Sequence, residues 1–174
     1  TFLAGGAPLP RALRFAADMR AYADAAPGDI EALSFAARAQ LYVLRYAAPA
    51  DREAAALTAI ALATRVTEAN PEHPGGVHYL VHATDSPRFA RQGLAAARRY
   101  DRLAPDADHA LHMPSHIFLQ LGMWNEVAAA NERAWAASRA WVRSGGHGVA
   151  DMGSHSLQWL QYAHLQQGRW RASQ

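Results

Sequence analysis

Histidines at helical spacing are the residues of this sequence with the clearest chemistry. The stretch HALHMPSHIF, residues 109–118, carries His109, His112 and His116, and an earlier stretch carries His78 and His82. Residues three and four positions apart share one face of a helix, so each set forms a stripe of imidazole rings. Two imidazoles at positions i and i+4 can bind one divalent ion. The spacing therefore predicts a metal site.

The ligand chemistry of such a site follows from the residue types present. The sequence contains no cysteine, so a metal ion must be held by histidine nitrogen and carboxylate oxygen. Histidine nitrogens suit a divalent transition metal, and Zn, Cu and Fe all fit the pattern. The pair His78-Tyr-Leu-Val-His82 lacks the glutamate of H-E-x-x-H hydrolases, which argues against a peptidase. A third ligand from His112 or His116 would complete a three-histidine site with an open position.

Two features near these histidines have alternative interpretations. Pro114 removes a hydrogen bond inside a helix and clashes with the carbonyl of Ala110, so it either kinks one helix or marks the start of another. Asp85 is either a turn residue ahead of Ser86 and Pro87 or a partner that orients a histidine. The histidines themselves either ligate metal or form hydrogen bonds with one another and with a bound peptide.

The elements that must position these side chains are helices. Alanine is abundant whereas valine and isoleucine are sparse, which favours helix because β-branched side chains lose rotamer freedom in helices. Turn signals at 25–29, 69–76 and 103–108 separate the helical stretches. The pattern predicts helices over 10–25, 29–46, 51–69, 75–84, 87–103, 108–121, 124–142 and 152–166, with a further helix starting at 169.

Internal repetition indicates how these helices are arranged. The proline turns at positions 71 and 105 lie 34 residues apart, which is the period of a two-helix tetratricopeptide unit. The same shift superimposes two histidine pairs, placing His78 on His112 and His82 on His116. Because the histidines repeat along with the turns, we expect the two pairs to converge on one centre.

A second register relates LGMW at 121–124 to QGRW at 167–170, 46 residues later. It aligns His109 with His155, and the 12 residues beyond the 34-residue period fit an insertion at 144–154, where glycines interrupt the helical pattern. In tetratricopeptide arrays the first helix of each unit lines the concave face. We therefore predict an all-α, tetratricopeptide-like right-handed helical-repeat solenoid over 1–174, a single domain and a fragment of a longer chain. The candidate metal ligands on its concave face are His78, His82, His109, His112, His116 and His155.

Three stretches, residues 73–85, 104–124 and 154–170, resemble a bacterial group of tetratricopeptide-repeat proteins that carries HPGxxHYxxH and HAxHMPSHIF motifs. The resemblance covers the chain best from about residue 65 to the C-terminus. It implies an all-helical repeat fold but supplies no reaction. It also points to the histidines that the group shares, namely His73, His78, His82, His109, His112, His116 and His155.

Charge and hydropathy exclude several classes of partner. A net charge of +2 is too small to indicate a nucleic-acid partner, and no run reaches the roughly 18 apolar residues that span a membrane. We expect a cytoplasmic protein without nucleic-acid or membrane partners. Two functions stay open. One is a metal-binding helical repeat, with a metal-dependent enzyme as one form of it. The other is a tetratricopeptide scaffold that binds a peptide or partner protein in its groove without metal.

Overall fold

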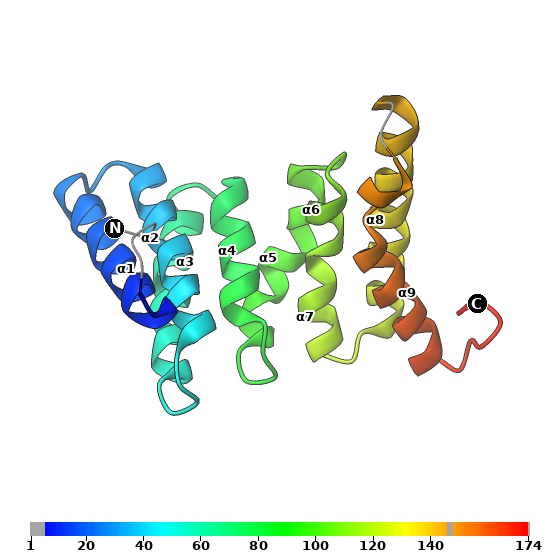
Figure 1. The fold of residues 1–174 in the computed structure, drawn as a ribbon, viewed down its shortest axis with the longest axis horizontal. Helices are drawn as coiled ribbons and strands as arrows, with labels where there is room; N and C mark the ends of the chain where they lie inside the picture. Colours follow the sequence, from blue (N-terminus) through cyan, green and yellow to red (C-terminus); the bar gives the residue numbers. More distant parts are fainter. Residues whose placement is uncertain (1–5, 146–147, 174) are drawn as a thin grey trace. The chain divides into compact units, whose positions relative to one another are not determined.

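The computed structural model describes residues 6–145 and 148–173, and every regular element in these ranges is helical (Figure 1). The prediction of an all-α protein is confirmed. None of the described helices combines the length and apolar character needed to cross a bilayer. The chain divides into two compact units, residues 1–84 and residues 85–174, which we call unit 1 and unit 2. Each is described by itself, and a single domain over 1–174 stays a prediction.

The described part of unit 1 consists of helices that follow one another along the chain: α1 (Pro8–Ala25), α2 (Ile30–Tyr46), α3 (Arg52–Ala69) and α4 (Pro74–Thr84). Each helix packs against the next, and α2 also contacts α4 (Figure 1). The buried faces of α2 and α3 are rich in alanine, with Ala37, Ala39 and Ala63 wholly buried. Such small side chains let neighbouring helix axes approach closely.

The start of α4 explains the HPGG portion of the first histidine motif. His73 is buried, and its Nδ1 accepts a hydrogen bond from the backbone N–H of Gly76 at 3.0 Å, so the imidazole satisfies an amide at the helix N-terminus. Its Nε2 lies 3.2 Å from Oε1 of Glu31 on α2. A Cβ on Gly76 would stand 2.5 Å from Cγ1 of Val66, so a side chain at this position would force α4 or Val66 to shift. His73 therefore acts as a cap that ties α4 to α2.

Unit 2 is built around its longest helix. Its elements are α5 (Ala90–Leu103), α6 (Asp108–His112), α7 (Pro114–Gln120), α8 (Trp124–Gly145), the short 3-10 helix η1 (Val149–Asp151) and α9 (Ser154–Gln166). Helix α8 contacts α6, α7 and α9, while α5 contacts α6 and α7 (Figure 1). Helix α5 begins three residues later than predicted, and residues 170–173 form turns in place of the helix predicted to start at 169. The predicted insertion at 144–154 includes residues 146 and 147, which lie outside the described ranges.

The helix predicted over 108–121 is interrupted at Met113, between α6 and α7. Met113 keeps right-handed helical dihedral angles, φ −52° and ψ −38°, so α6 and α7 are two segments of one kinked path. Pro114 has no N–H to donate to the preceding turn. The Ser115 hydroxyl instead donates a hydrogen bond to the carbonyl of His112 at 2.7 Å. Both interpretations of Pro114 hold in part, because Pro114 begins α7 while the helical angles of Met113 keep α6 and α7 on one kinked path.

Helix boundaries repeat with the periods found in the sequence. Helices α4 and α6 begin 34 residues apart, at Pro74 and Asp108, and so do α5 and α8, at Ala90 and Trp124. Helix α9 begins at Ser154, 46 residues after the start of α6. The two sequence registers therefore correspond to a repeat of helix starts.

The turns that follow α7 and α9 share one geometry. Gly122 and Gly168 adopt positive φ angles of 71° and 67°, a conformation that favours glycine. In each turn the residue after the glycine donates its N–H to the carbonyl five residues earlier, at 2.9 Å in both cases, as in a Schellman motif. The equivalence of the LGMW and QGRW stretches thus holds for the backbone as well as the sequence.

Candidate metal centre

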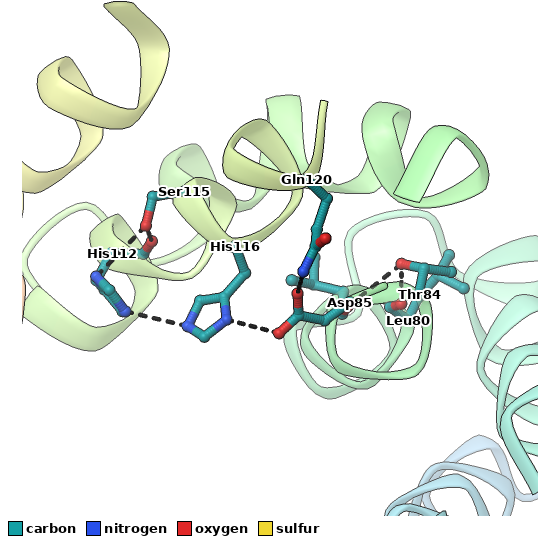
Figure 2. Close-up of polar contacts among 8 residues, drawn as sticks. Leu80, Thr84, Asp85, His112, Ser115, His116 and Gln120 are labelled. Atoms are coloured by element: carbon teal, nitrogen blue, oxygen red, sulfur yellow. Dashed lines mark hydrogen bonds and ion pairs between the residues drawn. The ribbon is translucent and has the colours of Figure 1, made fainter. Parts of the chain in front are cut away.

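Three histidines of unit 2 come together from three helices: His112 from α6, His116 from α7 and His155 from α9. One ring nitrogen of each lies within 4.8 Å of the corresponding nitrogens of the other two. The kink at Met113 leaves His112 and His116 close in space, with their ring centroids 5.0 Å apart. Figure 2 shows these two rings pointing toward one another, with His116 between His112 and Asp85.

His112 is the buried member of the group, with 3% of its surface exposed. Its Nδ1 lies 2.6 Å from Oδ1 of Asn131 on α8. The Asn131 amide nitrogen donates to the carbonyl of Val127 at 2.8 Å, which identifies the amide oxygen as the atom facing His112. The Nδ1 of His112 is therefore the protonated nitrogen of the neutral ring, and Nε2 carries the lone pair.

His116 is oriented in the same way by a carboxylate. Its Nδ1 lies 2.8 Å from Oδ2 of Asp85, and the other carboxylate oxygen accepts a hydrogen bond from Nε2 of Gln120 at 3.0 Å (Figure 2). A carboxylate that accepts the Nδ1 proton of a histidine fixes the ring orientation and makes Nε2 more basic. Of the two roles open to Asp85 in the sequence, the structure shows the one that orients a histidine.

These contacts direct two lone pairs to one point. The Nε2 atoms of His112 and His116 lie 3.1 Å apart, although each ring already commits its Nδ1 proton elsewhere. Two acceptors at this distance need a cation between them, either a proton or a metal ion. Two nitrogens bound to one Zn²⁺ at about 2.0–2.1 Å stand about 3.0–3.4 Å apart at near-tetrahedral angles. The observed spacing fits a shared ion.

The protonation state of His112 also suits metal binding. Burial lowers the pKa of His112 to about 4, assisted by the nearby imidazoles of His116, His155 and His109, while the hydrogen bond to Asn131 acts in the opposite direction. His112 is therefore neutral at pH 7, and only a neutral imidazole binds a metal ion.

His155 and Trp159, both on α9, complete the group around His112 and His116. The ring centroid of His155 lies 4.7 Å from that of His112, and the His155 side chain is exposed. The Trp159 ring lies 4.6 Å from His116 and 5.0 Å from His112. An ion held here would have an indole ring against two of its ligands and a solvent-facing third ligand.

The remaining predicted ligands lie elsewhere. His78 and His82 are neighbours on α4 in unit 1, with ring centroids 4.7 Å apart. His109 occupies the first turn of α6 and is exposed. Among the described residues of unit 2, the group that shares the 4.8 Å spacing consists of His112, His116 and His155. Convergence of His78 and His82 with these rings stays a prediction, as does a ligand role for His109.

No family model, curated protein or solved structure matches this chain. The resemblance to the bacterial tetratricopeptide-repeat group therefore stays an expectation.

Sequence reasoning did not find several residues of this site. Asn131 lies on a helical stretch without any histidine, whereas Gln120 follows His116 by four positions on the same helix. The roles of both depend on how α8 and α7 pack. Trp159 is another such residue, because its ring lies against His112, His116 and His155. The 46-residue register did contain one usable signal, because it aligned His155 of α9 with His109 of α6.

Proposed function

We propose that this protein binds a divalent transition-metal ion through His112, His116 and His155. The observation that carries the proposal is the 3.1 Å separation of the His112 and His116 Nε2 atoms, with both Nδ1 atoms hydrogen-bonded to oxygen acceptors. Histidines that only fill a helical core do not need two such orienting partners directed to one point. The arrangement is that of metal-bound histidines supported by an outer shell of amide and carboxylate groups.

The ligand set indicates the class of metal and the state of its coordination sphere. Three imidazole nitrogens suit Zn, Cu or Fe. Three protein ligands leave a position for water or a substrate, as in three-histidine zinc enzymes. A metal-dependent enzyme is thus one form of the proposal. In that form Asp85 serves to orient His116, since both its carboxylate oxygens already accept hydrogen bonds.

We further propose that the helices form a tetratricopeptide-like right-handed repeat. Support comes from the 34-residue spacing of helix starts in α4 and α6 and in α5 and α8, which equals the tetratricopeptide period. The matching glycine turns after α7 and α9 add to it. In such an array the first helices of successive units carry the histidines on one face.

The test is metal content of protein purified without an affinity tag. The protein is stripped with chelator, reloaded with Zn²⁺, Cu²⁺ or Fe²⁺ in turn, and analysed for bound metal after removal of excess ion. We expect close to one ion in unit 2. The bound ion should also raise the free energy of unfolding, by about 2.7 kcal/mol when free metal is a hundredfold above its dissociation constant.

Two substitutions connect the ion to this group. His155→Ala removes an exposed ligand and should weaken binding while leaving the fold intact, and His116→Ala should abolish binding. Gln158→Ala, an exposed change on the same helix as His155, serves as the control and should bind metal normally. An unfolding midpoint indifferent to chelator and to all three metals would end the proposal and favour a scaffold that binds a peptide.

Predicted ligands outside the group are tested by the double variant His78→Ala/His82→Ala. If these residues contribute to the same ion, the double variant loses metal affinity along with His116→Ala. If they hold a second ion, the stoichiometry falls by one. Unchanged affinity and stoichiometry would remove both residues from the ligand set.

A further inference from the structure

A pocket of about 390 Å³ lies between α2 and α4, wholly within unit 1. Two arginines, two tyrosines and two histidines line it together with two leucines of α2. The polar and aromatic lining residues are Arg38, Tyr42, Arg45, His78, Tyr79 and His82. The proposed metal centre in unit 2 uses none of the α2 residues, so their arrangement calls for its own explanation.

Helical spacing places the α2 residues on one face. Arg38, Tyr42 and Arg45 stand at positions i, i+4 and i+7, which form a single stripe on a helix. On α4, His78 and His82 are four residues apart in the same way. Because α2 and α4 contact each other, these stripes form the two walls of the pocket.

The permanently charged side chains that line the pocket are both positive. Arg38 and Arg45 are permanently cationic, and none of the lining residues is an aspartate or glutamate. Glu31 places a negative charge near Tyr79, and the Glu31 carboxylate lies 3.2 Å from Nε2 of His73. The pocket therefore attracts an anion.

The guanidinium group of Arg38 is held in place before any ligand arrives. Its central carbon lies 5.1 Å from the centroid of the Tyr42 ring, a cation–π contact. The charge of Arg38 also acts on the nearby Tyr79 hydroxyl. Burial raises the pKa of Tyr79, partly offset by the charge of Arg38, so this hydroxyl stays neutral at pH 7. A fixed guanidinium loses less conformational entropy on binding than a mobile one.

We propose that this pocket binds a small aromatic carboxylate, with its carboxylate between Arg38 and Arg45 and its ring against Tyr42 and Tyr79. The planar guanidinium fork matches a carboxylate through two parallel hydrogen bonds. The tyrosine rings and leucines supply the apolar wall that a ring requires. A volume of about 390 Å³ lies near the lower end of the range of roughly 300–1,000 Å³ for small-molecule sites, so the ligand is a small molecule.

The experiment is a titration of the full chain with sodium benzoate, followed by backbone amide NMR shifts, with chelator present and ionic strength constant. We expect saturable shifts in α2 and α4. Benzamide has the same shape without the charge, and acetate has the charge without the ring. Each should bind at least about tenfold more weakly than benzoate. Benzamide lacks the charge that the arginines bind, and acetate lacks the ring that the tyrosines contact.

Arginine variants test which side chains bind the carboxylate of benzoate. Arg45 is exposed, so Arg45→Gln leaves the packing of α2 intact and should weaken benzoate binding about five- to tenfold, and Arg38→Gln should weaken it further. Arg65→Gln removes the same charge from an exposed position on α3 outside the pocket and should have no effect.

Four results would overturn the proposal, three of them from the titrations in chelator. They are equal binding of benzamide and benzoate, equal weakening by Arg65→Gln and Arg45→Gln, and the absence of saturable shifts in α2 and α4. Binding that appears only when metal replaces the chelator would also overturn it, since a metal ion would then hold the carboxylate. Loss of metal binding in unit 2 leaves the benzoate result unchanged, so the two proposals fail separately.

Discussion

Asn131 of α8 accepts the Nδ1 proton of His112 of α6 across 2.6 Å, and this bond decides which nitrogen of His112 faces His116. Asn131 is wholly buried, and its amide nitrogen is already bound to the carbonyl of Val127. The asparagine cannot turn its amide around without losing that bond. The tautomer of His112, and with it the direction of the Nε2 lone pair, is therefore set by a residue that would never touch the ion.

Replacing Asn131 by leucine should weaken metal binding without removing a ligand. The substitution keeps a side chain of similar volume but deletes the acceptor, so His112 is free to adopt the other tautomer. Loss of such an orienting partner costs about 10–100-fold in metal affinity. Competition against a chelator of known affinity measures the change. Glu132→Ala, an exposed change on α8, is the control, and equal affinity in both variants would contradict the assigned role.

The same substitution should also destabilise the metal-free protein. A buried imidazole N–H left without an acceptor costs about 1–3 kcal/mol. Urea unfolding in chelator would report this loss as a lower midpoint, which separates it from the effect on metal affinity. If Asn131→Leu were as stable as the native chain in chelator, the bond to His112 would contribute nothing to folding.

The metal-free protein should lose stability as the pH falls. Burial lowers the pKa of His112 to about 4 in the folded protein, whereas an unfolded histidine titrates near about 6.5. Between these values the unfolded chain binds the extra proton, so the free energy of unfolding decreases as the pH falls from about 6.5 to 4. The total loss from this group is on the order of 3 kcal/mol.

Urea unfolding in chelator at pH 7.5, 6.5, 5.5 and 4.5 measures that loss. His112→Gln should flatten the pH dependence relative to the native chain, because it removes the titrating group. His155→Gln changes an exposed ring and should keep most of the slope. The assignment to His112 fails if the two variants show the same pH dependence.

The fluorescence of Trp159 should fall when a paramagnetic metal ion binds. Its ring lies 4.6 Å from that of His116 and 5.0 Å from that of His112, so a paramagnetic Cu²⁺ ion bound by these histidines would quench its fluorescence. We expect quenching that saturates near one equivalent of Cu²⁺ and largely disappears in Trp159→Phe. Trp141→Phe removes a half-exposed indole of the same unit and should leave the quenching in place. Equal quenching in the two variants would put the ion elsewhere.

The fold was predictable where the signal was local. Helix positions followed from periodicity and turns, and the glycine turns at Gly122 and Gly168 could be anticipated because positive φ angles select glycine. The start of α5 was set too early, since the sequence Ser86-Pro87 resembles a helix start although the chain forms a turn there. Local signals of this kind place a boundary only to within a few residues.

The candidate site was predictable only in part. The spacing of His112 and His116 identified the pair, because residues four apart share a helix face. The sequence offered Asp85 as one candidate for orienting a histidine, but it did not pair Asp85 with His116 or indicate Asn131. These two residues are 31 and 19 residues away from the histidines they contact. Those contacts exist only once α7 and α8 have packed. Tertiary packing therefore decides which lone pairs meet, and sequence spacing alone cannot.

The approach of α4 to α3 gives a last prediction, which tests the HPGG portion of the motif. A Cβ on Gly76 would stand 2.5 Å from Cγ1 and 3.1 Å from Cβ of Val66, and Val66 is wholly buried. The valine has no room to retreat, so Gly76→Ala must push the two helices apart. Overpacking of this kind costs about 1–3 kcal/mol, although alanine is otherwise the better helix former. Gly28→Ala is the matched control, because no atom lies within 4 Å of its added Cβ. Thermal unfolding of both variants should show a lower midpoint for Gly76→Ala alone, and equal midpoints would mean that α4 shifts to accommodate the methyl group.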